Sequence, residues 1–344
     1  MSDDPRTCPI VWGPLAIGLA LIGGCEGPPP TVAPAMFLKG HEKEVVSLAF
    51  SPDGKSLASR SSDAVKLWDV EGQTERKSLP SDGSSFAAVT FAPDGKTLAE
   101  NRAGAGVMTW DVPSGDPRTF HRSPPLPEGF AGDSVTYGWG LAYSPDGKTL
   151  AGGGSHQGAD GYVTLWDTSG GEGSNLGSYG SPVSTVAYAP DGRTLAAGGM
   201  DGSVDLWDTA TRRVRNRLAA SRAYLAPIAF SPDGLTLATA SEDRKIRLWD
   251  VATGTDRGVL KGHLKGVFGV AYHPGGRFLA SSDAGGTIFL WNLASRQAVA
   301  RLEGHRGKVW AVAFAPGGRF LASGGEDRTV RLWDVSGSTQ SGGR

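Results

Sequence analysis

Tryptophan recurs along this chain at a nearly constant interval, and that period constrains the fold more than any other feature. Successive members are separated by 42, 56, 41, 42, 42 and 42 residues. Six are followed by Asp and one by Asn. The seven residues are Trp68, Trp110, Trp166, Trp207, Trp249, Trp291 and Trp333. A period of about 40 to 45 residues is typical of four-stranded units that stack side by side, so we expect seven such units.

A second marker, a turn signal, precedes each of these tryptophans. It contains Pro followed by Asp-Gly or Gly-Gly, at Pro52, Pro93, Pro145, Pro190, Pro232, Pro274 and Pro316. Proline fixes φ for the second turn position, Asp bonds the local backbone, and Gly accepts a positive φ. In the last repeat the pattern predicts strands at Val309 to Phe314, Phe320 to Gly324 and Thr329 to Asp334. The segment after each Trp-Asp, such as Gln297 to Leu302, supplies a fourth strand.

Together the two markers resemble the WD-repeat (WD40) family, in which Gly-His opens and Trp-Asp closes a unit. The resemblance covers residues 36–336 and implies an all-β, seven-bladed β-propeller of four-stranded antiparallel blades. It also implies that an N-terminal strand closes the ring. Ala35 to Lys39, before Gly40-His41, is then the outer strand of the last blade and removes an open sheet edge. We expect truncation before Lys39 to destabilise the whole ring.

The same resemblance implies a buried hydrogen-bond chain in each blade that joins a His, a Ser or Thr, an Asp and the Trp. Matching sets are His41, Ser59, Asp63 and Trp68 in blade 1, and His305, Ser323, Asp327 and Trp333 in blade 7. Because the His and Asp recur in separate blades, a structural role is favoured over a catalytic one. Blade 6 has His263 but Gly285 where Asp is expected, and blades 2, 4 and 5 lack the His. We expect those blades to depend on packing alone, with blade 2 the softest.

Nothing in the sequence indicates an enzyme, a cofactor, a metal site or a nucleic-acid partner. Lys plus Arg number 34 against 35 for Asp plus Glu, so no overall field attracts nucleic acid. The only cysteines are Cys8 and Cys25, which leaves the repeats without thiol ligands or nucleophiles. No phosphate-binding loop or nucleophile elbow appears. We therefore expect a monomer that binds other proteins.

Two tryptophans, Trp139 and Trp310, are not explained by the repeat, and both occupy the same repeat position as Phe268. The resemblance places that position at the start of the innermost strand, near the channel mouth on the face commonly used for partners. Nearby repeat positions hold Tyr137, Tyr224, Lys308, Glu242 and Glu326. Aromatic residues ringed by charge are typical of binding hot spots. The alternative is that some of them only cover the channel rim.

Repeat 3 carries the sizeable insertions, within residues 120–137 and 153–161. Long loops on a rigid scaffold often carry function, and both insertions should lie beside Trp139. A loop rich in Pro and Gly is equally compatible with neutral decoration.

The N-terminus has the features of a targeting signal with an anchor. Residues 10–24 are uncharged and mostly apolar, and they are shorter than the roughly 20 residues a spanning helix needs. They fit a signal-peptide core and end in Leu-Ile-Gly-Gly-Cys25, which resembles a bacterial lipobox. This implies a signal peptide at 1–24, lipid on Cys25 and a bacterial cell-envelope location. Residues 25–35 read as a Pro-rich tether and 337–344 as a flexible tail.

Asp3 and Asp4 in the first residues depart from the usual positive charge, so an uncleaved apolar tail or a misassigned start stays open. The preferred hypothesis is a non-catalytic protein-binding scaffold displayed on a membrane surface, facing the extracytoplasmic side. One alternative is a small-ligand-binding or enzymatic propeller that uses its central channel. A second is a cytoplasmic WD-repeat regulator, if the signal is not processed.

Overall fold

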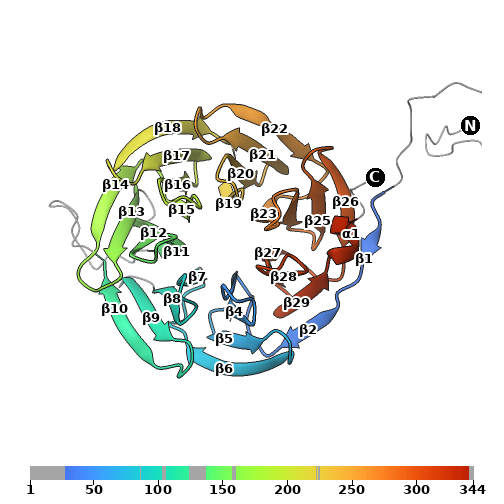
Figure 1. Cartoon of the computed structure of the whole chain (residues 1–344), viewed down its shortest axis with the longest axis horizontal. Helices are drawn as coiled ribbons and strands as arrows, with labels where there is room; N and C mark the ends of the chain where they lie inside the picture. Colours follow the sequence, from blue (N-terminus) through green and yellow to red (C-terminus); the bar gives the residue numbers. More distant parts are fainter. Residues whose placement is uncertain are drawn as a thin grey trace, which may run out of the picture.

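Seven β-sheets stand side by side around a central hole in the computed structural model of this chain (Figure 1). The structure describes residues 28–85, 87–102, 106–123, 137–156, 160–221, 223 and 225–340. Apart from a single short helix, its regular elements are all strands. The predicted seven-bladed β-propeller of four-stranded antiparallel blades is confirmed.

Each blade runs from an innermost strand next to the hole to an outermost strand on the rim (Figure 1). The innermost strands are β3 (Ser47–Phe50), β7 (Val89–Phe91), β11 (Tyr137–Tyr143), β15 (Val183–Tyr188), β19 (Leu225–Phe230), β23 (Val267–Tyr272) and β27 (Val309–Phe314). The second strands are β4 (Ser56–Arg60), β8 (Thr97–Arg102), β12 (Thr149–His156), β16 (Thr194–Gly199), β20 (Thr236–Ser241), β24 (Phe278–Asp283) and β28 (Phe320–Gly325).

The third strands carry the repeated Trp and are β5 (Ala64–Asp69), β9 (Gly106–Asp111), β13 (Asp160–Asp167), β17 (Ser203–Asp208), β21 (Lys245–Asp250), β25 (Ile288–Asn292) and β29 (Thr329–Asp334). The outermost strands are β6 (Thr74–Pro80), β10 (Pro117–Arg122), β14 (Ser174–Tyr179), β18 (Arg213–Ala219), β22 (Asp256–Lys261), β26 (Gln297–Leu302) and, in blade 7, β2 (Met36–Lys39).

The repeated turns have one geometry in all seven blades. The last Gly of each turn has φ between 68° and 72°, a region that L-residues with a Cβ rarely adopt. These residues are Gly54, Gly95, Gly147, Gly192, Gly234, Gly276 and Gly318. The turn sequence therefore sets the reversal between the first and second strand of every blade.

Ring closure follows the expected device. Strand β2 pairs antiparallel with β29, with Leu38 opposite Val330, so blade 7 is built from both ends of the chain. The expected tether differs in part from the structure. Its residues Thr31–Val32 form β1, which pairs in parallel with β26 of blade 6. Ser336–Gln340 form the short helix α1, which includes the start of the expected flexible tail at 337–344, and residues 341–344 lie outside the described residues.

The apolar core is divided among the seven seams between neighbouring blades, with one cluster of buried residues at each seam. In the described residues the cluster between blades 6 and 7 has eleven members, including Trp333. The cluster between blades 2 and 3 has five, including Trp166. Stacking neighbours buries what a single blade cannot bury, which explains why the repeats must assemble.

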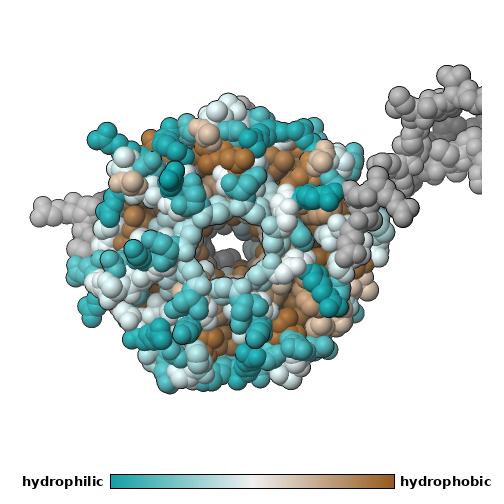
Figure 2. All heavy atoms as spheres, in the orientation of Figure 1, coloured by the Kyte–Doolittle hydropathy of each residue, from teal (hydrophilic) through white to brown (hydrophobic). Residues whose placement is uncertain are grey.

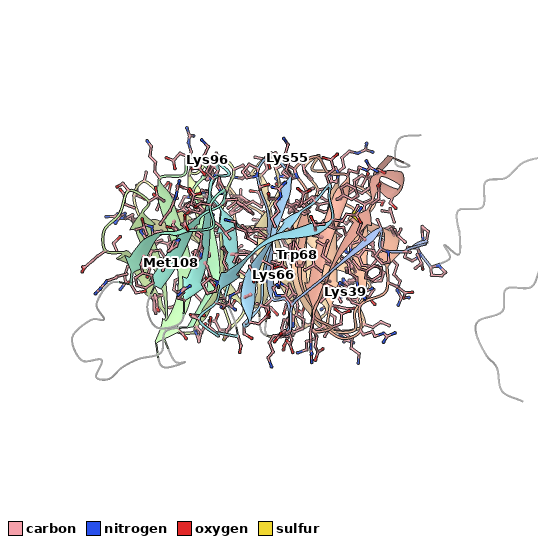
Figure 3. The ribbon with its side chains drawn as sticks, turned by 90° about the horizontal axis from the view of Figure 1, so that it is seen from below. Lys39, Lys55, Lys66, Trp68, Lys96 and Met108 are labelled. Atoms are coloured by element: carbon pink, nitrogen blue, oxygen red, sulfur yellow. The ribbon has the colours of Figure 1, made fainter. Side chains whose placement is uncertain are left out.

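Two faces of the disc differ in what they expose. The turn face carries the seven repeated turns, and Lys55 and Lys96, next to the first two, lie at its edge in the side view of Figure 3. The loop face carries the connections from each outermost strand to the next blade and from each second to third strand. Figure 2 shows that the hole passes through the ring and is bordered by hydrophilic residues on the face in view.

Candidate interaction surface

The position shared by Trp139, Phe268 and Trp310 is a β-bulge in the innermost strand. The strand register shifts at Trp310 between Val309 and Ala311, and at Phe268 between Val267 and Gly269. The same shift occurs at the equivalent position in blades 3, 4 and 5. A bulge adds an unpaired residue and re-aims its side chain, and in blade 7 this residue, Trp310, lines the channel.

Trp310 is the centre of a polar and aromatic cluster on the loop face. Its ring meets Phe268 of blade 6 edge-on at 5.2 Å, and Lys308 Nζ lies 4.8 Å from its centroid. Its indole N–H donates to Glu44 of blade 1 at 2.9 Å. The Lys308 backbone N–H donates to Glu326 at 2.9 Å. The cluster thus joins blades 6, 7 and 1, with Trp310 and Lys308 half-buried and both glutamates exposed.

Phe268, predicted to contact a partner, is largely covered in the structure. Only 7% of it is exposed, because Trp310 and Lys308 cover it. It supports the cluster from below. The residue that sequence analysis missed is Leu264, which is 81% exposed on the loop before β23. Glu242 is exposed beside that loop, where a Cβ on Gly266 would lie 3.1 Å from its Cα.

The remaining predicted contact residues fall partly outside the described structure. The backbones of Tyr137 and Trp139 belong to β11, but their side chains lie outside the described residues, as does all of Tyr224. Most of the first repeat 3 insertion is also outside them. The second insertion extends the hairpin of β12 and β13 as far as the pairing of His156 with Asp160. These residues therefore remain a prediction.

The described residues that line the central channel have no ionisable side chains. The channel volume is about 330 Å³, and the described residues around it are small, apolar or hydroxyl-bearing, apart from Trp310 at the mouth. Typical members are Ser47, Ala88, Thr185 and Val270. General acid–base or metal chemistry requires titratable groups, and none of these lining residues supplies one.

The polar chain of blade 7 is buried and continuous. Trp333 Nε1 donates to Ser323 Oγ at 2.8 Å, and Ser323 Oγ lies 2.7 Å from His305 Nε2. His305 Nδ1 contacts both oxygens of Asp327 at 3.0 Å. Burial lowers the pKa of His305. A neutral ring that accepts from Ser323 and donates to Asp327 satisfies every member of the chain.

Blade 1 repeats this chain with a looser end. His41 Nε2 and Trp68 Nε1 each lie 2.7 Å from Ser59 Oγ. The distance from His41 Nδ1 to Asp63 is 3.5 Å, beyond a good hydrogen bond. Asp63 instead accepts the backbone N–H groups of Glu42 and Lys43 at 3.3 Å, which holds the loop.

Blade 6 has a complete chain, so the expectation of a missing acid at Gly285 was wrong. His263 Nδ1 lies 2.9 Å from Asp283, and His263 Nε2 lies 2.7 Å from Ser281. Trp291 Nε1 donates to Ser281 at 2.7 Å. Asp283 is the last residue of β24 and lies two residues before Gly285, where the acid was expected. Its side chain also accepts the N–H of Gly285 and of Thr287. One carboxylate therefore closes both the chain and the turn.

Blade 2 does not depend on packing alone, contrary to expectation. Glu100 occupies the strand position that Ser323 has in blade 7 and is 0% exposed. Arg60, from blade 1, is also fully buried and donates from Nε to Glu100 at 3.3 Å and from Nη2 to Asp82 at 3.1 Å. Arg60 also bonds Ser84, in the loop between blades 1 and 2. The guanidinium of Arg60, from the neighbouring blade, thus holds the loop that leads into blade 2. In blade 7 the equivalent loop is held by His305.

Blades 4 and 5 also satisfy their tryptophans without a histidine. Trp207 Nε1 donates to the hydroxyl of Tyr179, from blade 3. Trp249 Nε1 donates to Thr239 Oγ1 at 3.0 Å. By contrast, Trp110 Nε1 of blade 2 has no partner among the described residues.

The part of the chain that the structure describes contains no group of three or more His, Cys, Asp or Glu positioned to hold a metal ion. In the same residues, no helix has the length and apolar character needed to cross a membrane.

Comparison with known proteins agrees with this architecture. The family described as the IFT122 first beta-propeller matches residues 35–292, and the WD domain, G-beta repeat family matches residues 296–334. Proteins of these families commonly bind protein partners and are typically non-catalytic. No curated protein matches the chain. The chain belongs to the WD-repeat β-propellers, in the family of the first propeller of IFT122.

Proposed function

We propose that this protein is a non-catalytic scaffold that binds a protein partner through its loop face at blades 5, 6, 7 and 1, while lipid on Cys25 displays it on a membrane surface. The observation that carries the binding part is the Trp310 cluster. A bulge places a half-exposed Trp beside Lys308, Glu44 and Glu326 at the channel mouth. Aromatic anchors within a charged rim are typical of interface hot spots.

Leu264 extends this surface. At 81% exposed it is the most exposed large apolar side chain among the described residues. Together Leu264, Trp310, Lys308, Glu242 and Glu326 form what we call the loop-face patch. Its charges have both signs, which favours a partner with a complementary pattern over a simple polyanion. The uncharged channel lining argues against catalysis there.

Photo-cross-linking in cells tests which face binds. A photoreactive residue is placed at Leu264 on the loop face or, as a matched control, at Leu235, which is 57% exposed beside a turn on the opposite face. We expect a discrete cross-linked product from position 264 and none from position 235. A product from position 235 alone would overturn the loop-face assignment.

The anchor is supported by the sequence Leu-Ile-Gly-Gly-Cys at 21–25, which lies outside the described residues. Its test is the intact mass of the protein expressed in a bacterium, together with its division between membrane and soluble fractions. We expect a chain that starts at Cys25 and carries acyl groups, lost in Cys25→Ala but retained in the control Cys8→Ala. An unmodified full-length soluble chain would contradict the anchor and place the partner search in the cytoplasm.

A further inference from the structure

The N-terminal segment is fixed to the outer rim of the disc. The backbone carbonyl of Pro30 accepts from Arg301 N at 2.8 Å, and Thr31–Val32 pair with β26 of blade 6. Ala35 N then donates to Leu332 O at 2.8 Å, and β2 follows along blade 7. Figure 1 shows β1 and β2 on the outside of the ring, away from the central hole.

A lipid on Cys25 therefore cannot lie far from this rim. Pro30 lies five residue steps after Cys25, with four residues between them, and an extended chain spans at most about 3.3–3.6 Å per step. The bilayer surface is thus held within roughly 18 Å of the edge of blade 6. The segment between Cys25 and Pro30 leaves the disc at its rim. Its attachment therefore does not favour contact of either face with the lipid.

The rim next to this attachment combines an uncharged stretch with an exposed aromatic ring. Residues 27–38 contain no charged side chain. Phe37 is 51% exposed on this stretch, with the guanidinium of Arg331 4.8 Å from its ring centroid. Lys39 follows at the end of the strand and is exposed. Arg331 is itself buried and paired with Asp327 at 3.0 Å, so Lys39 is the exposed cation beside this ring. An exposed aromatic ring next to an exposed Lys suits the boundary between headgroups and acyl chains.

We propose that the rim formed by residues 28–39 on blades 6 and 7 rests against the bilayer, so that the disc stands edge-on and both faces stay open to partners. This inference rests on the proposed lipid anchor at Cys25. Its occupant is a lipid surface that contains anionic headgroups. In an edge-on disc the loop face stays accessible to another protein, even though only a short segment joins the disc to the lipid.

Fluorescence quenching on liposomes tests the orientation. The acylated chain, in liposomes of phosphatidylcholine with phosphatidylglycerol, receives one cysteine labelled with a fluorophore, and some lipids carry a headgroup spin label. Acylation removes Cys25 as a free thiol. The positions are Ala35→Cys on the proposed contact rim, Asn175→Cys on β14 across the ring, Leu264→Cys on the loop face and Leu235→Cys on the turn face.

We expect quenching at Ala35→Cys to exceed that at Asn175→Cys by at least about twofold, since only surfaces near the headgroups lie within the roughly 5–10 Å interfacial layer. Quenching at the two faces should be equal and intermediate. Strongest quenching on either face would mean that the disc lies flat, and equal quenching at all four positions would mean no preferred orientation. Either result overturns the inference while leaving the anchor intact.

Phe37→Ser tests whether the rim contacts the membrane or is only attached to it through the lipid on Cys25. We expect it to reduce quenching at Ala35→Cys, whereas the matched control Phe120→Ser, at a residue 37% exposed on the outer strand of blade 2, leaves it unchanged. Unchanged quenching in Phe37→Ser would overturn the contact. An unacylated mass would instead overturn the anchor, and with it this inference, before quenching is measured.

Discussion

Blade 7 and blade 2 share one four-stranded frame but bury their polar groups by different means. In blade 7 a neutral His305 links Ser323 to Asp327 within the blade. In blade 2 the charged pair Arg60 and Glu100 reaches across the seam from blade 1. The comparison teaches that the frame accepts a different buried network provided that each polar group has a partner.

Apolar packing is also less extensive beside blade 2 than beside blade 7. The cluster between blades 6 and 7 contains eleven buried residues, against five between blades 2 and 3 in the described structure. The seam between blades 2 and 3 also holds a cavity of about 20 Å³, lined in part by Arg102 and Trp166. That volume accommodates about one water molecule. We therefore expect the ring to open first beside blade 2.

Removal of one member of the charged pair should have the largest effect. Glu100→Ala leaves Arg60 buried with less compensation, and we expect the free energy of unfolding to fall by about 3–5 kcal/mol in urea titration. The control is the double variant Arg60→Met with Glu100→Met, which we expect to stay near the wild type. A loss below about 1 kcal/mol in the single variant would show that the pair is not the polar support of blade 2.

Ser323→Ala tests the neutral chain of blade 7. It removes the partner of both His305 and Trp333, and we expect a loss of about 2 kcal/mol. Thr239→Val in blade 5 removes one bond, to Trp249, and should cost about 1 kcal/mol. Equal losses in the two variants, measured by chemical denaturation, would argue against a connected chain in blade 7.

His121→Leu should make blade 2 more like blade 7. His121 pairs with Val107 as Leu38 pairs with Val330, so it fills an apolar position of the outer strand. It is 2% exposed, and its Nδ1 has no partner among the described residues. We expect a gain of about 1 kcal/mol, whereas the reverse change Leu38→His should destabilise. A loss of stability in His121→Leu, seen by thermal or urea unfolding, would contradict this assignment.

The same residue predicts a small pH effect. Burial lowers the pKa of His121, with an opposing contribution from Asp167. The unfolded chain then binds a proton at higher pH than the folded chain, so this residue reduces stability as pH falls below about 6.5. The advantage of His121→Leu should therefore grow between pH 7.5 and pH 5.5. An advantage that shrinks on acidification would show that the folded ring binds the proton more readily.

The fold could be predicted because its signals are local. Each turn and each Trp-Asp lies within one repeat, so their order alone defines strands and blades. Asp283 was missed because the acid was sought at one fixed turn position, and it lies two residues earlier. The pairing of Arg60 with Glu100 joins strands 40 residues apart, and no local pattern encodes it. The available hint was Glu100 itself, because its strand position holds Ser or Thr in blades 1, 5, 6 and 7.

The interaction surface shows the same division. The shared repeat position of Phe268 and Trp310 was visible in the sequence, but the bulge and the burial of Phe268 depend on how three blades meet. Leu264 carries no sequence signal, since an apolar residue in a loop is read as exposed only once the loop is placed.

Cross-linking from Leu264 in variants of the loop-face patch tests the central claim most directly. A photoreactive residue at position 264 is combined with Trp310→Ala and Lys308→Glu, or with the control Arg319→Glu on the turn face. The account predicts that the cross-linked product is lost in the first combination and retained in the control, with both proteins folded. Retention of the product without Trp310 and Lys308 would contradict the assignment of this surface.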